Sequence, residues 1–322
     1  MADIPAFKDI EAAHLRIKKY IHKTPVLTSS SINKMVNSDV FFKCENFQKA
    51  GAFKYRGATN AILSLSKDKA KKGVATHSSG NHAAALALAA KMSNINCHIV
   101  MPENAIPVKI DAVRSYGAEI TFCKPTLESR EQTLNELINK NGAVFIPSYN
   151  CFEVICGQGT AVKELIEEVK ELQYILIPVG GGGILSGSAI AAKAINPSIK
   201  IIGIEPANAD DAYRSFKSGR LIPSVNPKTI ADGLLTSLGE LTFEIIRKKV
   251  NDIITVTEES IIYAMKIIWE RMKIIIEPSA AVTLAAILEN KNIFKDKKTG
   301  VVLTGGNVDL VNLPFTLQSS RR

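Results

Sequence analysis

The sequence predicts an α/β protein built on open, mostly parallel sheets. From about residue 73, short apolar runs alternate with segments of helical length, and the alternation resumes after residue 150. Because a parallel strand is reached through a crossover connection, this order favours parallel sheets that are covered by helices. Residues 174–179 are apolar almost throughout, as is usual for strands that are buried on both faces of such a sheet.

The two alternating stretches predict their own sets of strands and helices. In the first stretch we expect strands at 73–76, 97–101, 120–123 and 143–146 and helices at 83–92, 108–116 and 129–140. In the second we expect strands at 174–179, 200–204, 253–256 and 301–303 and helices at 159–170, 183–194, 258–272 and 279–289. Near the N-terminus, residues 9–22 have helical spacing, residues 40–44 suit a strand, and Lys54 opens a helix. Residues 215–229 contain Pro and Gly and predict a surface loop.

We expect two domains, the larger of which is discontinuous in the sequence. The larger domain would comprise residues 1–66 and 151–322, and the smaller one residues 67–150. In open parallel sheets, ligands bind beyond the carboxyl ends of the strands. The loops that follow predicted strands and carry polar or glycine residues are 78–82, 180–183, 205–211 and 304–307. We therefore expect these loops to meet in one cleft between the domains.

Charge and cysteine usage narrow the class of protein. The net charge is +9, but the lysines are scattered, which argues against nucleic-acid binding and suits small anionic substrates. The five cysteines are odd in number and show no CxxC or His-linked spacing, so we expect neither disulfides nor a zinc site. The first 18 residues lack the apolar run of a secretory signal, and no stretch is apolar for the length of a membrane span. We expect a cytoplasmic protein without a nucleic-acid or membrane partner.

Four consecutive glycines, Gly180, Gly181, Gly182 and Gly183, lie at a predicted strand–helix junction and precede Ile184. A turn without Cβ atoms lets backbone N–H groups surround a phosphate, and the helix N-terminus adds a positive partial charge. An ordinary tight turn does not need four glycines. The pattern also differs from GxxxxGK[ST] and from GxGxxG, so a phosphate site is favoured over a dinucleotide site.

Lys54 follows Gly51 and Phe53 at the start of a predicted helix. Most lysines are solvated surface charges, and this residue alone would indicate nothing more. When it is combined with a phosphate-binding loop, however, a desolvated amine can bind an aldehyde covalently. The two motifs together predict pyridoxal 5′-phosphate (PLP), a cofactor that carries both groups. The alternative is a non-catalytic phosphate- or nucleotide-binding module, which would show no visible chromophore.

The run Ser78-Ser79-Gly80-Asn81-His82 places hydroxyls, an amide and backbone N–H groups at a predicted helix start. This arrangement suits a substrate carboxylate. A simple N-cap would explain one of these residues but not all five. His82 alone is compatible with a structural histidine, and we assign it no catalytic role.

These motifs resemble those of the fold type II PLP enzymes, the tryptophan synthase β and serine-threonine dehydratase family. The similarity covers nearly the whole chain and is closest to the amino-acid racemases of that family. The matching segments are residues 24–30, 53–54, 77–82, 157–161, 205–211, 230–233, 269–273, 276–278 and 305–310. Together these segments are highly specific for the family.

The resemblance implies a role for each residue of the cofactor site. Lys54 would carry PLP, Asn81 would form a hydrogen bond with the ring hydroxyl, and Thr304 would meet the pyridine nitrogen. The four glycines and the Ile184 N–H would hold the phosphate. Racemases of the family usually have serine where this chain has Thr304, and threonine keeps the hydroxyl. A neutral partner of this kind leaves the ring nitrogen unprotonated, which makes the cofactor a milder electron sink.

The resemblance also implies a metal site, a nucleotide site and a homodimer. Glu205, Asp211 and the Ala209 carbonyl form an oxygen-only set suited to Mg²⁺, or to Ca²⁺ or Mn²⁺. Their spacing alone favours a solvated acidic loop, and it is the resemblance that favours the metal. Ala50 and Ala84 replace polar residues of the family's ATP site, so ATP activation is implied less strongly than PLP. The positions that match that site are Ser29, Ser30, Lys49, Tyr116, Lys273 and Asn307.

The implied reaction is racemisation of L-serine to D-serine, with β-elimination of serine to pyruvate and ammonia as a second activity. The chain would thus be an isomerase that is also a lyase. Lys54, as a free amine, would take the Cα proton of L-serine. Ser79 would supply the second acid on the opposite face, since similar dehydratases usually have alanine at its position. The alternative is an L-serine/L-threonine dehydratase with little racemisation, and we expect no C-terminal regulatory domain.

Overall fold

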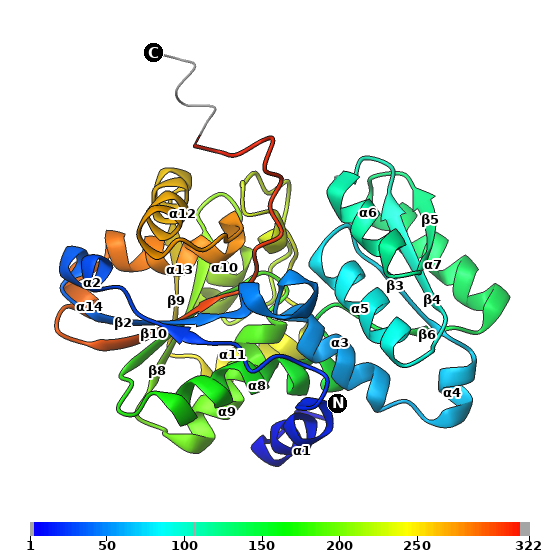
Figure 1. The fold of residues 1–322 in the computed structure, drawn as a ribbon, viewed down its shortest axis with the longest axis horizontal. Helices are drawn as coiled ribbons and strands as arrows, with labels where there is room; N and C mark the ends of the chain where they lie inside the picture. The colour runs from blue at the N-terminus through cyan, green and yellow to red at the C-terminus, as the bar shows by residue number, and fades with distance from the viewer. Residues whose placement is uncertain (1–2, 106, 316–322) are drawn as a thin grey trace.

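The computed structural model describes residues 3–105 and 107–315, which form two sheets that lie side by side (Figure 1). The larger sheet has the strand order β1-β2-β10-β7-β8-β9, and the smaller one has the order β5-β4-β3-β6. All neighbouring strands are parallel except β1, which runs antiparallel to β2. The predicted α/β fold with open parallel sheets is confirmed.

The two sheets draw their strands from different parts of the chain. The larger sheet contains β1 (Val26–Leu27), β2 (Asp39–Cys44), β7 (Tyr174–Pro178), β8 (Lys200–Pro206), β9 (Asp252–Val256) and β10 (Lys298–Leu303). The smaller sheet contains β3 (Val74–His77), β4 (Cys97–Pro102), β5 (Glu119–Cys123) and β6 (Val144–Phe145). Both ends of the chain therefore contribute to the larger sheet. The domain boundaries at residues 66 and 150 stay a prediction.

Helices cover both sheets and connect their strands. The first seven are α1 (Phe7–Ile17), α2 (Ser30–Val36), α3 (Lys54–Leu63), α4 (Lys67–Lys71), α5 (Asn81–Met92), α6 (Pro107–Ser115) and α7 (Leu127–Asn141). The others are α8 (Phe152–Glu168), α9 (Gly183–Ile195), α10 (Asp211–Ser218), α11 (Glu240–Lys249), α12 (Glu258–Met272), α13 (Pro278–Glu289) and α14 (Lys291–Phe294). Short 3₁₀ turns lie at η1 (Glu45–Phe47), η2 (Lys49–Gly51) and η3 (Asp232–Leu234).

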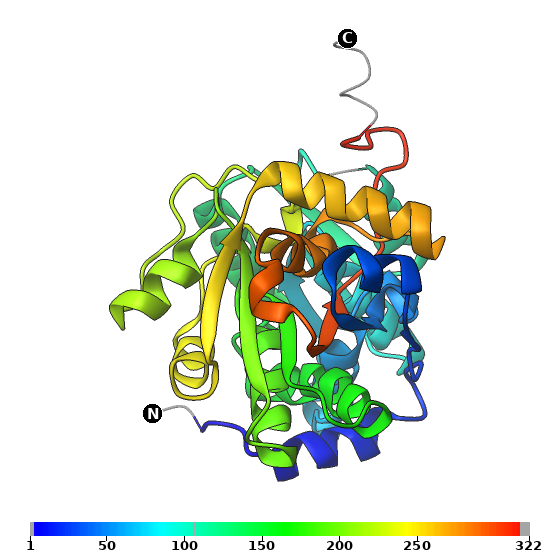
Figure 2. The same cartoon turned by 90° about the vertical axis from the view of Figure 1, so that its left-hand side faces the viewer.

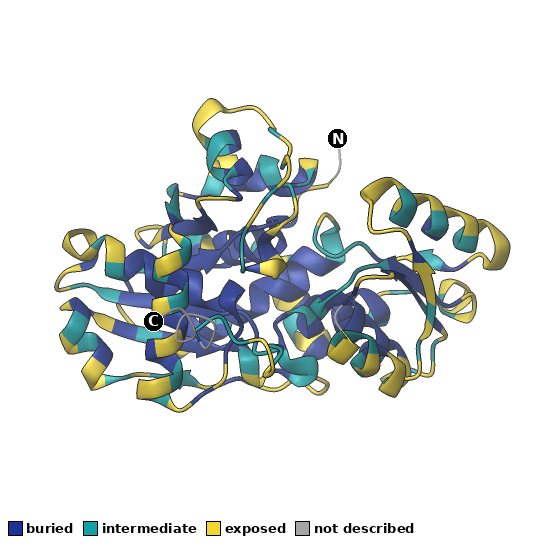
Figure 3. Cartoon of the chain, turned by 90° about the horizontal axis from the view of Figure 1, so that it is seen from above, coloured by how far each residue is buried: buried dark blue, intermediate teal, exposed yellow. Residues whose placement is uncertain are grey.

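The larger sheet is buried on both faces, as its apolar strands require. Along β10, Val301 and Leu303 pack into one hydrophobic cluster with α12 and α13, whereas Val302 packs into another with α8 and α9. Successive side chains of a strand point to opposite faces, so an uninterrupted apolar strand serves two cores at once. Figure 2 shows α12 and α13 on one side of this sheet and α8 and α9 on the other. Figure 3 shows the buried residues in the interior of both sheets and the exposed ones on the outer helices.

Small residues allow α8 and α9 to cross at very short range. A Cβ atom at Gly159 would lie 2.7 Å from the Gly187 carbonyl oxygen, and one at Gly187 would lie 2.3 Å from the Ile155 carbonyl oxygen. Neither helix could carry a side chain at this contact, because the two backbones themselves touch. This close crossing places the start of α9 firmly against the rest of the larger sheet. None of the described helices is long and apolar enough to cross a membrane.

Several predicted boundaries were wrong, and tertiary contacts explain two of them. The helix expected at 159–170 begins at Phe152, because glycines that lower helix propensity are tolerated where they permit close packing. The loop expected at 215–229 begins only after α10, which ends at Ser218. Glu205, expected in a loop, belongs to β8, and its carboxylate accepts hydrogen bonds from the first turn of α10. The first helix ends at Ile17 and does not reach residue 22.

Candidate active site

A cavity of about 220 Å³ is lined by loops that follow strands of both sheets. From the smaller sheet come residues 77–82, after β3, and residues 148–149, after β6. From the larger sheet come residues 180–184, after β7, and Thr304, after β10. The structure thus brings together Lys54, Ser79, Asn81, the four glycines, Ile184 and Thr304. The loop at 205–211 does not line this cavity.

Lys54 is the first residue of α3 and lines the cavity. Its Nζ donates a hydrogen bond to the Ser148 carbonyl oxygen at 2.8 Å and lies 5.2 Å from the centre of the Phe53 ring. Burial lowers the pKa of Lys54 from 10.5 to about 8, although the Glu277 carboxylate opposes the shift. At neutral pH this lysine therefore supplies far more neutral amine than a solvated lysine does.

Buried ion pairs anchor the helix that carries Lys54. We call Lys43, Glu45, Arg56 and Glu164 the Arg56 cluster. The fully buried Arg56 guanidinium donates two hydrogen bonds to Glu45, at 2.7 and 2.9 Å, and two to Glu164, both at 2.8 Å. Lys43 donates a further hydrogen bond to Glu164 at 2.7 Å. Two positive and two negative side chains thus compensate one another and fix α3 against β2 and α8.

The four glycines, called the glycine loop from here on, present only backbone to the cavity. Gly182 has a φ of 87°, a conformation that favours glycine. A Cβ atom at Gly181 would lie 2.3 Å from Cδ1 of Tyr149, and one at Gly182 would lie 2.8 Å from Cδ2 of Leu238. Side chains from the surroundings therefore already occupy the space behind the loop. The loop leads directly into α9, whose N-terminus adds a positive partial charge next to the cavity.

Asn81 and Thr304 both bring polar groups to the cavity, but the two groups differ in their hydrogen bonding to the described residues. The Asn81 amide donates hydrogen bonds to both carboxylate oxygens of Glu277, at 2.8 and 3.0 Å, and accepts one from Asn307 at 2.9 Å. Burial raises the pKa of Glu277 to about 7. The Thr304 hydroxyl is buried and has no hydrogen-bond partner among the described residues. Because buried hydroxyls are almost always bonded, this one is suited to a ligand group.

His82 and Ser79 lie close together in sequence but differ in what they can do. His82 is buried, and its Nε2 donates a hydrogen bond to the Ile146 carbonyl oxygen at 3.1 Å. Burial lowers the pKa of His82 to about 3, so the imidazole stays neutral at physiological pH. Ser79 lies in the loop between β3 and α5 and lines the cavity that contains Lys54. Of the two residues, only Ser79 offers a proton that is not already used in such a bond.

The cavity contains charged residues to which the sequence assigned no role. Lys109 of α6 forms an ion pair with Asp232 of η3, and this pair links the two sheets across the cavity. Arg130 of α7 also lines the cavity, and its Nε is buried without a partner among the described residues. Glu277 stood within a matching segment but was given no function. Only the three-dimensional contacts reveal these residues, because each lies far in sequence from the groups it faces.

The proposed metal ligands lie together at the end of β8. The carboxylate of Glu205 is fully buried and accepts hydrogen bonds from the N–H groups of Ala212 and Tyr213 at 3.0 and 2.8 Å. Both Asp211 oxygens are buried without a hydrogen bond of standard geometry to any described residue. Burial raises the pKa of Asp211 to about 6 and that of Glu205 to about 9. No described group of three His, Cys, Asp or Glu side chains could hold a metal, so a site here depends on two carboxylates and backbone oxygens.

The six nucleotide positions do not all share one cavity. Tyr116 and Asn307 line a cavity of about 160 Å³, together with Ala50 and Ala84. Ser29 caps the start of α2, where its hydroxyl accepts the Ile32 N–H at 3.4 Å. The remaining positions, Ser30, Lys49 and Lys273, do not line that cavity either.

Comparison with known proteins places this site in a family. Residues 17–305 match the family model described as "Pyridoxal-phosphate dependent enzyme". The chain belongs to the pyridoxal-phosphate-dependent enzymes. It is 54% identical to the serine racemase of Dictyostelium discoideum, over 95% of this chain and 96% of the relative. It is 49% identical to the β-hydroxyaspartate dehydratase of Paracoccus denitrificans (strain Pd 1222), over 97% and 99%. The crystal structure of the Dictyostelium racemase superimposes with a TM-score of 0.91 and covers 95% of this chain and 99% of that one.

Three features of the cavity in this PLP-dependent enzyme match the cofactor independently of the comparisons. A lysine with a lowered pKa can react with an aldehyde. A side-chain-free loop at a helix N-terminus can hold a phosphate. The Thr304 hydroxyl, which has no partner among the described residues, can meet a ring nitrogen. These three groups line one cavity, as a cofactor that carries all three functions requires.

Proposed function

We propose that this enzyme converts L-serine to D-serine and also eliminates water from serine, after which hydrolysis of the product gives pyruvate and ammonia. The observation that carries the proposal is the presence in one cavity of Lys54, at the start of α3, and Ser79, on the loop that follows β3. Racemisation needs one group to remove the Cα proton and a second to return a proton on the other face. The 54% identity to a serine racemase supports serine as the substrate.

The chain's own residues supply binding and proton transfer. When it is bound, PLP withdraws electrons from the bond between Cα and its hydrogen, which makes that proton acidic. Lys54 has a pKa of about 8, so its neutral amine is available to take this proton. The Ser79 hydroxyl returns a proton from the opposite side. N–H groups at the start of α5 bind the substrate carboxylate with the help of the helix dipole.

The cofactor contacts that we propose use residues that line the cavity. Lys54 binds the aldehyde of PLP, and Asn81 forms a hydrogen bond with the ring hydroxyl. The hydroxyl of Thr304 meets the pyridine nitrogen, and this assignment is supported because the hydroxyl is buried and has no partner among the described residues. The N–H groups of the glycine loop and of Ile184 hold the phosphate, which the absence of side chains at the loop supports.

Substitution of Ser79 by alanine tests the two-base mechanism. D-serine and pyruvate are measured in the same reaction that starts from L-serine. Ser79→Ala should lose D-serine formation and keep pyruvate formation, because elimination needs no proton donor on the second face. A variant that still forms D-serine at the wild-type rate would assign the second proton to another group.

A second candidate function is elimination from a β-carboxylated substrate such as 3-hydroxyaspartate. Arg130 lines the cavity, and its Nε, which has no partner among the described residues, could pair with a second carboxylate. A relative that is 49% identical is named a β-hydroxyaspartate dehydratase. Steady-state kinetics with L-serine and with 3-hydroxyaspartate distinguish the two functions. A kcat/KM for 3-hydroxyaspartate far above that for serine, and no D-serine formed, would favour this candidate.

We also propose a divalent cation, with Mg²⁺ as the first choice, bound by Glu205, Asp211 and the Ala209 carbonyl. Two buried carboxylates with raised pKa values lie in one place, and the oxygens of Asp211, which lack a hydrogen bond of standard geometry to any described residue, support a cation there. The cation would order the turn between β8 and α10. It would thereby stabilise the larger sheet without taking part in proton transfer.

The remaining proposals concern assembly and regulation. The enzyme forms a homodimer in the cytosol, and the five free cysteines suit a reducing compartment. ATP activates it through Ser29, Ser30, Lys49, Tyr116, Lys273 and Asn307. Sedimentation velocity at assay concentrations tests the dimer, and activity with and without Mg·ATP tests the nucleotide site. A monomer would contradict the first proposal, and an unchanged rate the second.

A further inference from the structure

The glycine loop is held from behind by the first turn of α11. Thr242 is fully buried there, and its hydroxyl donates a hydrogen bond to the Gly181 carbonyl oxygen at 2.8 Å. The Thr242 hydroxyl oxygen also accepts the Gly239 N–H at 2.9 Å and lies 3.0 Å from the Gly239 carbonyl oxygen. One side-chain hydroxyl therefore ties the loop to the start of this helix.

This hydrogen bond fixes the orientation of a backbone N–H group in the loop. The Gly181 carbonyl and the Gly182 N–H belong to one trans peptide plane and point in opposite directions. With the carbonyl held towards α11, the Gly182 N–H has to point away from α11. Gly182 also has a positive φ of 87°, and glycine adopts many other conformations as readily. The loop therefore depends on its neighbours to keep this shape.

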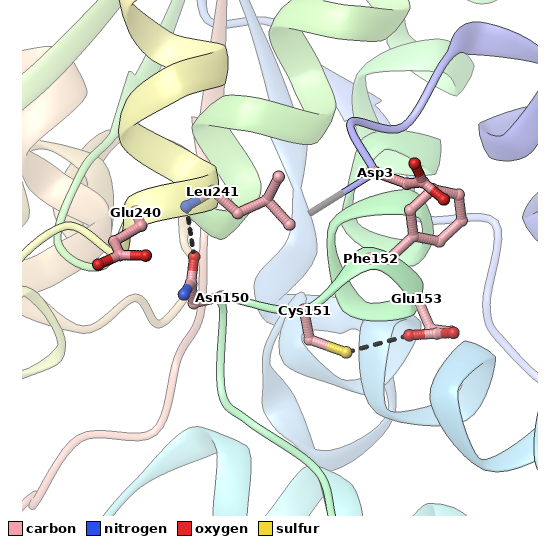
Figure 4. Close-up of a pocket in the computed structure, with 7 residues that line it drawn as sticks. All are labelled: Asp3, Asn150, Cys151, Phe152, Glu153, Glu240 and Leu241. Atoms are coloured by element: carbon pink, nitrogen blue, oxygen red, sulfur yellow. Dashed lines mark hydrogen bonds between the residues drawn. The ribbon is translucent and has the colours of Figure 1, made fainter. Parts of the chain in front are cut away.

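A second segment holds α11 and the loop from the other side. Oδ1 of Asn150 accepts the N–H groups of Leu241 and Thr242 at 3.1 and 3.3 Å, and Figure 4 shows this amide pointing at the start of α11. The ring of the preceding Tyr149 fills the space that a Cβ at Gly181 would need. The Ser148 carbonyl accepts the hydrogen bond from Lys54. Residues 148–150 thus contact the lysine, the loop and α11 in succession.

We propose that Thr242, supported by Asn150, is a positioning residue for the phosphate of PLP. The inference rests on the proposed placement of that phosphate in the glycine loop. Without the Thr242 hydroxyl, the loop of the cofactor-free protein would spread over several conformations. Binding would then have to select the competent one, and the apparent affinity falls by the fraction of molecules that have it. The aldehyde end, at Lys54, would be unaffected.

The test compares Thr242→Val with Thr242→Ser. Valine keeps the shape of threonine without the hydroxyl, whereas serine keeps the hydroxyl. Cofactor-free protein is titrated with PLP and, separately, with pyridoxal, which has the aldehyde but no phosphate, and absorbance reports binding at Lys54. We expect roughly tenfold weaker PLP binding by Thr242→Val, near wild-type binding by Thr242→Ser, and equal pyridoxal binding by all three proteins.

Asn150 provides an independent pair of variants in case Thr242→Val fails to fold. Asn150 is exposed, so Asn150→Ala should fold, and it should weaken PLP binding by roughly threefold. Asn150→Asp keeps the acceptor oxygen and should restore the affinity. Unchanged PLP affinity in Thr242→Val or, failing that, in Asn150→Ala would overturn the inference, as would an equal loss for pyridoxal. Wild-type protein that binds no PLP would overturn the proposed cofactor site as well.

Discussion

Lys54 and Arg56 lie two residues apart on α3, yet they belong to regions with opposite electrostatics. In the Arg56 cluster, every buried charge faces an opposite charge at hydrogen-bond distance. In the cavity around Lys54, the charges are only partly compensated. The pKa of Lys54 falls to about 8, that of Glu277 rises to about 7, and the hydroxyl of Thr304 has no partner among the described residues.

This difference separates a structural role from a chemical one. In the compensated cluster, the pKa of Arg56 is raised and that of Glu164 is lowered in spite of burial, so the opposite charges favour the charged forms of both and the cluster fixes geometry. An uncompensated cavity holds groups whose protonation changes near neutrality, as proton transfer requires. The first region holds α3 in place, and the second uses the lysine at the start of that helix. Burial alone would not have distinguished them, because Glu277 and Thr304 are buried like the members of the Arg56 cluster.

The largest expected effect is that of Lys54→Ala. The variant should show no visible absorption from bound PLP and no measurable turnover of L-serine, because the other described lysine that lines the cavity, Lys109, is held in an ion pair with Asp232 and does not replace the Lys54 amine. Its free energy of unfolding should not fall, since a poorly compensated buried amine is removed. Lys67→Ala, an exposed lysine of α4, is the control and should behave as wild type. Retained absorption in Lys54→Ala would mean that another lysine binds the cofactor.

Replacing a buried glutamate by glutamine in each region tests the difference between the Arg56 cluster and the cavity. Glu164→Gln removes a charge from the Arg56 cluster and leaves Arg56 and Lys43 with one carboxylate, so we expect a loss of roughly 3 kcal/mol in the free energy of unfolding. Glu277→Gln replaces a carboxyl that is already partly neutral at pH 7 and should cost less than about 1 kcal/mol. Urea unfolding of cofactor-free protein measures both values. Equal losses would show that the two regions do not differ in the way described.

Metal binding provides a smaller effect at a third buried acidic site. Excess Mg²⁺ should raise the melting temperature of wild type by a few degrees, because a ligand that binds only the folded state stabilises it. Asp211→Asn should lose this response, since one of the two proposed carboxylates is gone. Asp210→Asn is the matched control, because Asp210 pairs with Arg214 instead. If Mg²⁺ still raised the melting temperature of Asp211→Asn, the cation would have to bind at another site.

The parts of the molecule that could be predicted from the sequence are those with a local signal. The βαβ alternation predicted the parallel sheets, because a short apolar run indicates a buried strand by its own residues alone, without information from the rest of the chain. The glycine loop and the run from Ser78 to His82 could be singled out because each is a short unusual run. The roles of Ser79, of the metal ligands and of the nucleotide positions stay predictions that the experiments above address.

What could not be predicted depends on contacts between distant segments. Glu277 and Asn81 are 196 positions apart, and Lys109 and Asp232 are 123 apart, so no periodicity links either pair. The early start of α8 had the same origin, since glycines that weaken a helix locally permit its packing against α9. Thr242 resembles any threonine of an amphipathic helix until its hydroxyl is seen to meet the glycine loop.

The smallest expected effect is a shift in the pH dependence of PLP uptake. Only the neutral amine of Lys54 reacts with an aldehyde, so the rate of uptake by cofactor-free protein should rise with pH and level off above about pH 8, whereas a solvated lysine would need about pH 10.5. The Glu277 carboxylate raises the pKa of Lys54, and therefore Glu277→Gln should move the midpoint to lower pH. Stopped-flow absorbance measures the rate between pH 6 and pH 10. Because the uncompensated cavity couples these two groups, a midpoint unmoved by Glu277→Gln would show that burial alone sets the state of Lys54.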